Sequence, residues 1–310
     1  MHALVTGGAG FIGSHICKRL LEEGCGVVCL DNFDPYYEPS LKRKNIEAML
    51  GDKNFELVEG DVRDFELLEK LCKDVDYLFH EAAQAGVRAS VENPIKTYEI
   101  NIEGTLNVLK ASADSNVKKV INASSSSVYG KVSYLPFDEK HPTNPISPYG
   151  VSKLAAENYC RVFSDVYGLK TVSLRYFTVY GPNIRPDLAI SVFTRKALKN
   201  EPIEIFGDGE KTRDFTHIND IVDANILLLK KGDGVFNLGY GKCFSINKLA
   251  EIIIKLTNSK SKIVHTESKK GDVEHTRSNA DKAKKVLEWT PNIALEMGLR
   301  DYIEHMERLR

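Results

Sequence analysis

The chain lacks the features that mark several large classes of protein. Six cysteines are scattered through its 310 residues, but no C-x-x-C pair occurs and no cysteine–histidine spacing suits zinc. We therefore expect small buried thiols of a reducing compartment and no metal site. No apolar run approaches the ~20 residues of a membrane span, and no charged and apolar leader precedes the first expected strand. A cytoplasmic location is the expectation that follows.

An excess of charge of one sign is also missing. Lysine and arginine together number 42 and aspartate and glutamate 43, which leaves a formal net charge of −1. This balance argues against nucleic acid or an anionic membrane as the main partner. The chain is longer than one typical core of roughly 100–200 residues. With 42% hydrophobic residues it can bury a sizeable interior, so two lobes are expected.

The order of the apolar segments predicts the fold class. In the first half, short β-branched runs alternate with amphipathic helical segments, which is typical of an α/β protein with a parallel sheet covered on both faces. We expect a Rossmann-type doubly wound parallel sheet, with strands at His2–Thr6, Gly26–Leu30, Phe55–Glu59, Asp76–Phe79, Val117–Asn122 and Thr171–Arg175, and helices at Ile12–Glu23, Phe65–Cys72 and Thr97–Ser112.

After Tyr180, glycine and proline separate shorter elements, which predicts a smaller C-terminal α/β lobe for substrate binding. Its expected helices are Ile218–Leu229, Ser245–Leu256 and Ala294–Leu309. The two lobes are assigned to residues 1–176 and 177–310, and the chain is allowed to cross between them.

The N-terminal segment predicts a phosphate-binding loop. Between the first strand and the first helix stand Gly7, Gly10 and Gly13, and the helix opens with Phe11 and Ile12. Glycine permits a tight turn and lets the backbone approach a pyrophosphate closely. The free N–H groups at the helix start then attract the anion. This strand–loop–helix context predicts dinucleotide binding.

An acidic residue downstream indicates which dinucleotide is bound. Asp31 follows Gly13 by 18 positions and ends the second strand. Its carboxylate can accept hydrogen bonds from ribose hydroxyls and would repel a 2′-phosphate. Neither Asn32 nor the residue after it is basic, so we predict NAD rather than NADP. Asp61 and Val62, after the third strand, are placed to meet the adenine edge; the alternative for Asp61 is a helix N-cap.

A second constellation predicts the chemistry. Tyr149 and Lys153 are four residues apart and therefore share one face of a helix. A phenol has a pKa of ~10, which we expect the ammonium and the positive nicotinamide to lower until Tyr149 serves as a base toward a sugar hydroxyl. Hydroxyls at the end of a parallel strand point into the ligand crevice, and Ser124–Ser127 occupy such a strand end. The alternative for some of these serines is a capping or turn role.

These motifs together resemble the NAD-dependent epimerase/dehydratase family, a group of extended short-chain dehydrogenases/reductases. The matching stretches are Thr6–Ser14, Asp31-Asn32, Gly60–Asp64, His80–Gln84, Ser124–Gly130, Tyr149–Lys153, Arg175–Pro182 and Gly207–Asp214. The resemblance implies that Ser125 is the hydroxyl partner of Tyr149 and that Lys153 binds the nicotinamide ribose. It further implies that Ala82, Ala83, Asn101 and Tyr176 line the NAD site, and that Arg213 contacts the diphosphate of a sugar nucleotide. A homodimer formed through helices around Thr97–Ser112 and Tyr149–Tyr167 is also implied.

The residues after Ser125 indicate the reaction. In family members that dehydrate their substrate, an aspartate–glutamate pair follows the hydroxyl residue, and decarboxylases carry a glutamate at the second following position. In this chain Ser126 and Ser127 occupy these two positions. Serine cannot exchange protons near neutral pH. We therefore predict a UDP-sugar 4-epimerase, in which Tyr149 takes the O4 proton, the C4 hydride passes to NAD, and the hydride returns to the opposite face of the 4-keto sugar.

The sugar is predicted from the stretch after residue 176. Thr178 stands where UDP-glucose epimerases usually carry asparagine, and the following residues through Arg185-Pro186-Asp187 resemble UDP-glucuronate 4-epimerases. Thr178 or Arg185 could bind the C6 carboxylate of UDP-glucuronate or UDP-galacturonate; the alternative for Arg185 is a surface salt bridge beside the pocket. Arg88, Ser126 and Asp272 are further expected substrate contacts. The alternative substrates are UDP-glucose/UDP-galactose or an N-acetylhexosamine, and the alternative activities are a 4-ketosugar reductase and a nucleotide-sensing scaffold.

Overall fold

A seven-stranded parallel sheet forms the centre of the structure, a computed structural model that describes residues 1–267 and 273–308. Its strand order is β10-β6-β5-β4-β1-β2-β3, and every neighbouring pair runs parallel. The strands are β1 (His2–Thr6), β2 (Gly26–Asp31), β3 (Phe55–Glu59), β4 (Tyr77–His80), β5 (Lys119–Ser125), β6 (Thr171–Tyr176) and β10 (Gly234–Leu238). The expected doubly wound α/β fold is confirmed.

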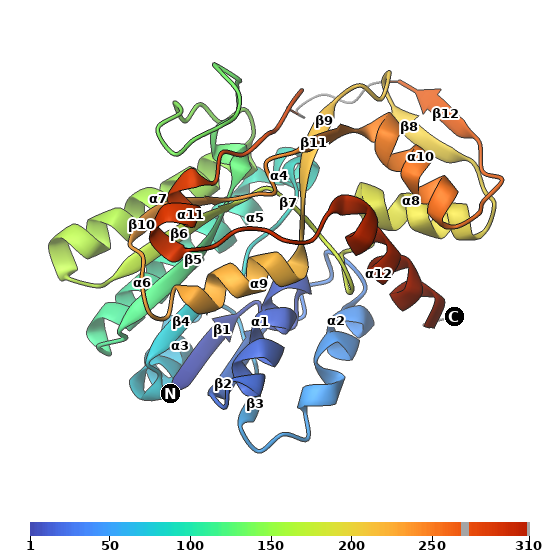
Figure 1. The fold of residues 1–310 in the computed structure, drawn as a ribbon. Coiled ribbons are helices and arrows are strands. Elements are labelled where there is room, and N and C mark those ends of the chain that lie inside the picture. The colour runs from blue at the N-terminus through green and yellow to red at the C-terminus, as the bar shows by residue number, and fades with distance from the viewer. Residues whose placement is uncertain (268–272, 309–310) are drawn as a thin grey trace.

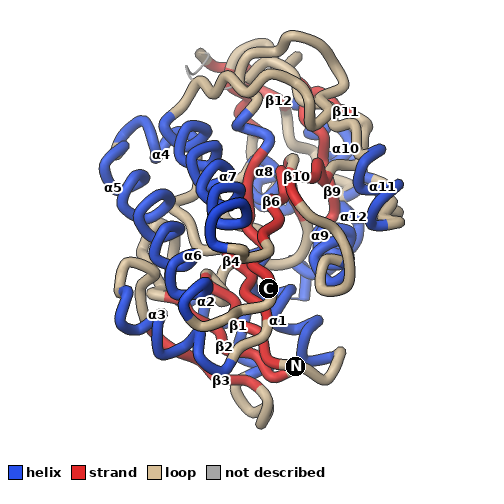
Figure 2. Tube along the Cα trace, turned by 90° about the vertical axis from the view of Figure 1, so that its left-hand side faces the viewer, coloured by secondary structure: helices blue, strands red, loops and turns tan. Residues whose placement is uncertain are grey.

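Helices cover both faces of this sheet (Figure 1). One layer contains α1 (Phe11–Glu22), α2 (Pro39–Ile46) and α9 (Ile218–Leu227), with α1 packed against α9. The opposite layer contains α3 (Phe65–Leu71), α6 (Gly104–Asp114) and α7 (Pro148–Tyr167), and Figure 2 shows the short helices α4 (Val87–Glu92) and α5 (Pro94–Tyr98) beside α7. From β1 the strand order runs to one side through β2 and β3 and to the other side through β4, β5 and β6, so the order reverses between β1 and β4. Ligands of such sheets bind at the carboxyl ends of the strands beside this point.

The helix expected over Thr97–Ser112 is not continuous. The chain forms α5, then a π-helical segment at Glu99–Glu103, and then α6. A π-helical turn inserts one extra residue into a helix and is frequent at functional sites. Asn101 lies inside this segment, so the interruption changes the direction of its side chain relative to a regular helix.

Local sequence explains where the long helix α7 begins and ends. Ser147 precedes it and accepts a hydrogen bond from the backbone N–H of Gly150 at 3.1 Å, and Pro148 takes the first helical position. The helix ends at Gly168, whose φ of +71° suits the left-handed cap conformation. These signals fix Tyr149 in the first turn of α7, at the carboxyl end of the sheet.

The C-terminal lobe contains two small sheets. One is three-stranded, in the order β11 (Cys243–Ser245), β9 (Thr212–His217) and β7 (Thr178–Tyr180); the other pairs β12 (Ile263–Thr266) with β8 (Ile203–Phe206). Its helices are α8 (Ala189–Leu198), α10 (Ile246–Leu256), α11 (Asp281–Leu287) and α12 (Leu295–Arg308). The chain returns to the large sheet through β10, which pairs with β6.

Two expectations from composition can be compared with the structure. Within the described residues, no helix is both long enough and apolar enough to cross a membrane. Five of the six cysteines are buried as free thiols, whereas Cys243 is exposed on β11. The expectation of buried thiols was therefore wrong for Cys243, because β11 lies in a small sheet of the C-terminal lobe with a solvated surface.

Candidate active site

A cavity of about 740 Å³ opens where the carboxyl ends of the large sheet face the C-terminal lobe. Its walls come from both halves of the chain, from the glycine loop after β1 to Arg213 on β9. The cavity is lined by these residues predicted from sequence: Gly7, Gly10, Phe11, Ile12, Gly13, Asp31, Asn32, Asp61, Val62, Ala82, Ala83, Arg88, Ser125, Ser126, Tyr149, Lys153, Tyr176, Thr178, Arg185 and Arg213. Asp272 lies outside the described residues.

The glycine loop is packed too tightly for side chains. A Cβ on Gly7, whose φ is +66°, would stand 2.7 Å from the backbone nitrogen of Ala82, and one on Gly13 would stand 2.3 Å from the carbonyl oxygen of Gly7. Gly10 occupies the N-cap position of α1 and has no side chain that could accept a hydrogen bond from the first N–H groups of the helix. The first N–H groups of α1 therefore point into the cavity with no capping group over them, as an anion site requires.

Asp31 is held in place by the backbone around it. Its carboxylate accepts hydrogen bonds from the N–H groups of Ala9, at 3.1 Å, and Phe33, at 2.8 Å. Lys42 of α2 reaches to 3.7 Å from the same carboxylate and is buried with it. Sequence reasoning missed Lys42, because nothing in the chain shows that α2 folds back over the end of β2.

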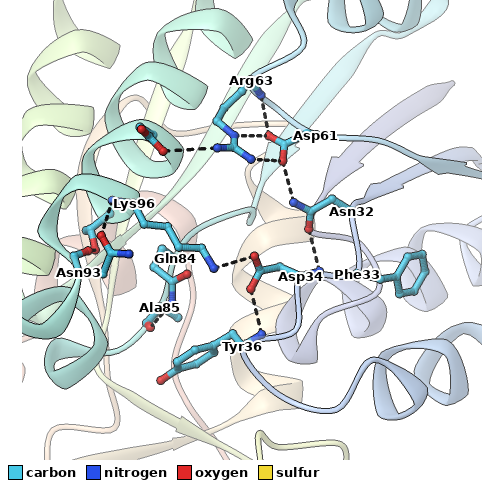
Figure 3. Close-up of polar contacts among 12 residues, drawn as sticks. Asn32, Phe33, Asp34, Tyr36, Asp61, Arg63, Gln84, Ala85, Asn93 and Lys96 are labelled. Carbon is cyan, nitrogen blue, oxygen red and sulfur yellow. Dashed lines mark hydrogen bonds and ion pairs between the residues drawn. The ribbon is translucent and has the colours of Figure 1, made fainter.

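A polar chain braces the neighbouring wall (Figure 3). The Asn32 side chain donates to Asp61 at 2.8 Å, and Arg63 donates to both oxygens of Asp61. Partial burial disfavours the charged carboxyl, but the bonds from Arg63 and Asn32 outweigh it and lower the pKa of Asp61 to about 2. The N-cap alternative for Asp61 is wrong, because Asp64 caps α3 by accepting from the Leu67 N–H at 3.0 Å.

Tyr149 and Lys153 face the cavity one turn apart on α7. The Lys153 ammonium lies 5.9 Å from the Tyr149 ring centre and donates to the Ala123 carbonyl oxygen at 2.8 Å. Burial lowers the pKa of Lys153 to about 8. Burial also raises the pKa of Tyr149, against the charge of Arg185 and a hydrogen bond with Ser125. The expected lowering of the Tyr149 pKa is therefore not found for the protein alone. The cation that opposes the rise is Arg185, whereas the sequence analysis expected Lys153.

The serines at the end of β5 have different roles. Ser125 accepts a hydrogen bond from the Ser127 N–H at 3.1 Å and lies in the cavity beside Tyr149. Ser124 donates instead to the buried carboxylate of Glu157 on α7. Ser125 thus has the capping role of the alternative, at the start of the short turn after β5, and its hydroxyl also donates to Ser127 at 3.1 Å. Ser124 is bonded away from the cavity, whereas Ser125 lines it.

Asn101 does not line the cavity as expected. It is buried behind the wall, where its amide accepts from the Gln84 N–H at 2.7 Å and donates to Ser152 at 2.9 Å. The π-helical segment places Asn101 between the loop after β4 and helix α7. It therefore braces two cavity walls from behind.

The substrate side of the cavity contains a cation. Arg185 donates to both carboxylate oxygens of Asp187, at 3.0 Å each, and only 18% of its side chain is exposed. Tyr36, from the loop after β2, donates to Asp187 at 3.2 Å. The salt bridge proposed as the alternative for Arg185 does exist, but it lies inside the cavity. At its edge, the Arg88 guanidinium stands 5.1 Å from the ring centre of Phe206.

The comparisons with known proteins agree on one family. Residues 3–239 match the profile of the NAD dependent epimerase/dehydratase family. The chain belongs to this family. It is 40% identical to the UDP-glucuronate 4-epimerase of Thermodesulfobacterium geofontis over 96% of this chain and 93% of that protein.

Two solved structures extend this likeness to three dimensions. The UDP-glucose 4-epimerase of Thermotoga maritima, with UDP-glucose, is 38% identical and has a TM-score of 0.94, over 100% of this chain and 99% of that one. The UDP-glucuronic acid 4-epimerase of Bacillus cereus, in complex with UDP-glucuronic acid and NAD, is 34% identical and has a TM-score of 0.95, over 100% of both chains.

The cavity fits the NAD of this enzyme family. The glycine cradle and the uncapped start of α1 suit a pyrophosphate, and Asp31 suits the ribose hydroxyls. Lys42 is bound to Asp31, so it does not stand alone as a site for a 2′-phosphate. The cofactor is therefore NAD, as the sequence predicts.

One further cavity residue escaped the sequence analysis. Glu81 follows β4 and lines the cavity together with Tyr149 and Lys153. Burial raises its pKa to about 7, although a hydrogen bond from Tyr176 and the charge of Lys153 oppose the rise. A carboxyl group directly after a buried strand, within a stretch already matched to the family, was a signal that could have identified it.

Proposed function

We propose that this protein is a UDP-sugar 4-epimerase that interconverts UDP-glucuronate and UDP-galacturonate. The observation that carries the proposal is the position of Arg185, which shares the cavity with Tyr149 closely enough for its charge to act on the Tyr149 pKa. In a hexuronate the C6 carboxylate is attached two bonds from C4, the carbon that is inverted. A base for O4 and a cation for C6 must therefore lie close together, as they do here.

The reaction needs one group that exchanges a proton with O4, and Tyr149 is that group. Ser125 accepts and donates hydrogen bonds beside it and positions the hydroxyl of the sugar. Lys153 supplies positive charge that favours the phenolate. NAD, held by the glycine loop and Asp31, would supply the acceptor and donor of the C4 hydride. Tyr149 then returns its proton to O4, so the protein ends each cycle in its starting protonation state.

The residues around Ser125 support epimerisation over dehydration. Ser126 and Ser127 line the cavity at the positions where a dehydratase needs an acid and a base. Glu81 lines the same cavity, but its carboxyl accepts a hydrogen bond from Tyr176 and makes none with Ser125 or Tyr149. No carboxyl side chain therefore stands at the two positions after Ser125.

A panel of UDP-sugars tests the substrate. We expect kcat/KM to be highest for UDP-glucuronate and UDP-galacturonate. Arg185→Met should lower kcat/KM for UDP-glucuronate by about 10- to 100-fold, the loss of one charge-assisted contact of roughly 1.5–3 kcal/mol, and should affect UDP-glucose much less. Asp187→Asn is the matched control, because it breaks the same ion pair but keeps the guanidinium. Much faster turnover of UDP-glucose than of UDP-glucuronate would show that the uronate assignment is wrong.

We also propose that the protein is a homodimer through the surface of α4, α5 and α7, which lie side by side (Figure 2). This surface exposes large apolar side chains, namely Val91, Ile95, Tyr98, Val151, Tyr159, Val162, Val166 and Tyr167. Contiguous apolar surface of this kind marks a protein contact, and a second copy of the chain can cover it symmetrically. Helix α7 contains the expected segment Tyr149–Tyr167, whereas the expected segment Thr97–Ser112 lies mainly on α6 and shares only Thr97 and Tyr98 with α5. A cytoplasmic location stays a prediction.

A further inference from the structure

Glu81 is part of a buried hydrogen-bond network that the reaction scheme does not use. Its Oε1 accepts a hydrogen bond from the Tyr176 hydroxyl at 2.9 Å. The amide of Asn225 donates to that hydroxyl at 2.9 Å and to the Ile221 carbonyl oxygen at 2.9 Å. The Tyr176 hydroxyl also lies 3.3 Å from the Asn225 amide oxygen, and its shorter contact as a donor is the one to Glu81. The carboxyl group is thus held in one position by β6 and α9.

The carboxyl of Glu81 lacks a cation. Among the described residues, no ammonium or guanidinium lies within ion-pair distance of it, and no donor bonds its Oε2. Lys153, whose charge does reach Glu81, is bonded to the Ala123 carbonyl oxygen. Arg185 is paired with Asp187. A half-buried carboxylate without a counter-charge is unfavourable, so the cavity is suited to a cation supplied by a ligand.

The position of Glu81 identifies which part of the ligand supplies that cation. Tyr149 exchanges a proton with the hydroxyl on C4 of the sugar. The nicotinamide ring, which exchanges a hydride with the same carbon, must therefore lie beside Tyr149 and Lys153. Glu81 lines the same cavity as Tyr149 and Lys153. Its hydrogen bond to Tyr176, the strand neighbour of Ser125, holds it at the carboxyl ends of β5 and β6. A nicotinamide ring beside Tyr149 and Lys153 would lie in the same part of the cavity. That ring is positively charged when oxidised and neutral when reduced.

We propose that Glu81 is the counter-charge for the oxidised nicotinamide, so that this protein binds NAD more tightly than NADH. The carboxylate attracts the oxidised ring and gains nothing from the reduced one, and the difference sets the ratio of the two affinities. An opposite charge at short range typically changes such an equilibrium by about tenfold or more. For a two-electron couple, a tenfold change corresponds to about 30 mV in the reduction potential of the bound cofactor. This inference holds for whichever UDP-sugar is the substrate.

A competition experiment without any sugar tests the proposal. Protein from which the co-purified nucleotide has been removed is equilibrated with equal concentrations of NAD and NADH, freed of unbound nucleotide by gel filtration, and analysed for the two bound forms. We expect an excess of bound NAD in the wild type and an excess about tenfold smaller in Glu81→Gln. Glutamine keeps an oxygen that accepts from the Tyr176 hydroxyl, so this variant removes the charge and retains the hydrogen bond. Tyr176→Phe removes the hydrogen bond and retains the charge of Glu81, so this variant should keep the preference for NAD.

A pH series provides a second measurement on the unaltered protein. The titratable groups that act on Glu81 are Tyr149 and Lys153 from α7, Tyr176 from β6, and its neighbour His80. Burial lowers the pKa of His80 to about 3 and that of Lys153 to about 8, so between pH 5.5 and 7.5 Glu81 is the member of this set whose charge changes most. The preference for NAD should therefore grow as the pH rises through about 7 in the wild type. Glu81→Gln should show a much smaller change, the part that Lys153 contributes.

Two results would overturn the proposal. One is a Glu81→Gln protein that binds the two nucleotides in the wild-type ratio, because the carboxylate would then contribute nothing to the choice. The other is a wild-type ratio that is constant from pH 5.5 to 7.5, a result that decides the question even if the variant does not fold. Neither result bears on the assignment of the sugar, which is tested by turnover alone.

Discussion

Replacing Glu157 should destabilise the protein strongly, because its partner is a cation that cannot leave the interior. Arg175 on β6 donates to both oxygens of Glu157 on α7, at 2.9 and 2.8 Å. Only 6% and 5% of the two side chains are exposed. Ser124 also donates to Glu157. In Glu157→Leu the guanidinium stays buried without a counter-charge and the serine loses its acceptor. The expected loss is about 3–5 kcal/mol in the free energy of unfolding.

The double variant Glu157→Leu/Arg175→Met separates charge from packing. With both ions removed, no charge remains buried, and the expected cost is below about 2 kcal/mol. Tyr129, which also bonds Arg175, keeps its hydrogen bond to Asn237 at 2.6 Å. Urea unfolding followed by circular dichroism and by the fluorescence of Trp289, the single tryptophan, gives both free energies. A single variant that loses less than about 1 kcal/mol, or a double variant as unstable as the single, would refute this reasoning.

Three further predictions concern the cofactor, the base and the dimer. Tyr149→Phe should retain bound NAD, measured by nucleotide analysis, but lose epimerase turnover by about 10²- to 10⁴-fold; unchanged turnover would contradict the mechanism. Gly13→Ala should purify without NAD, because its Cβ would stand 2.3 Å from a backbone oxygen of the loop, whereas Gly51→Ala, with no atom within 4 Å, should keep it. Val166→Glu, at a site 69% exposed on α7, should shift a dimer to monomer in size-exclusion chromatography, and Val286→Glu on α11 should not.

Much of the N-terminal half could be predicted because its signals are local. A buried parallel strand reads as a continuous apolar run, and β2 is predicted to within one residue of its observed end. The glycine loop and the spacing of Tyr149 and Lys153 each depend on a single turn of backbone. Topology then brings these local features to one edge of the sheet, so a largely correct set of cavity residues follows from strand ends alone.

The errors and omissions depend on contacts between distant segments. Lys42 reaches Asp31 only because α2 folds back over β2. Asn101 lies in a π-helical segment that interrupts the predicted helix, and it is bonded to Gln84 and Ser152 instead of lining the cavity. No residue type in that segment indicates the extra residue. Glu81 acquires its properties from Tyr176 and Asn225, which lie far along the chain. Burial and pairing of this kind are properties of the assembled fold.

The return of the chain to the large sheet has a consequence for biosynthesis. Strand β6 is buried along its whole length and pairs on one side with β10, which is made only after the smaller lobe has begun. Until residue 238 emerges, β6 is an open edge that another nascent chain can extend. At about 5–20 residues per second, the roughly sixty intervening residues take about 3–12 s to synthesise. A fragment that stops at residue 176 would keep this edge permanently, so the first lobe depends on the second to become a closed, non-aggregating sheet.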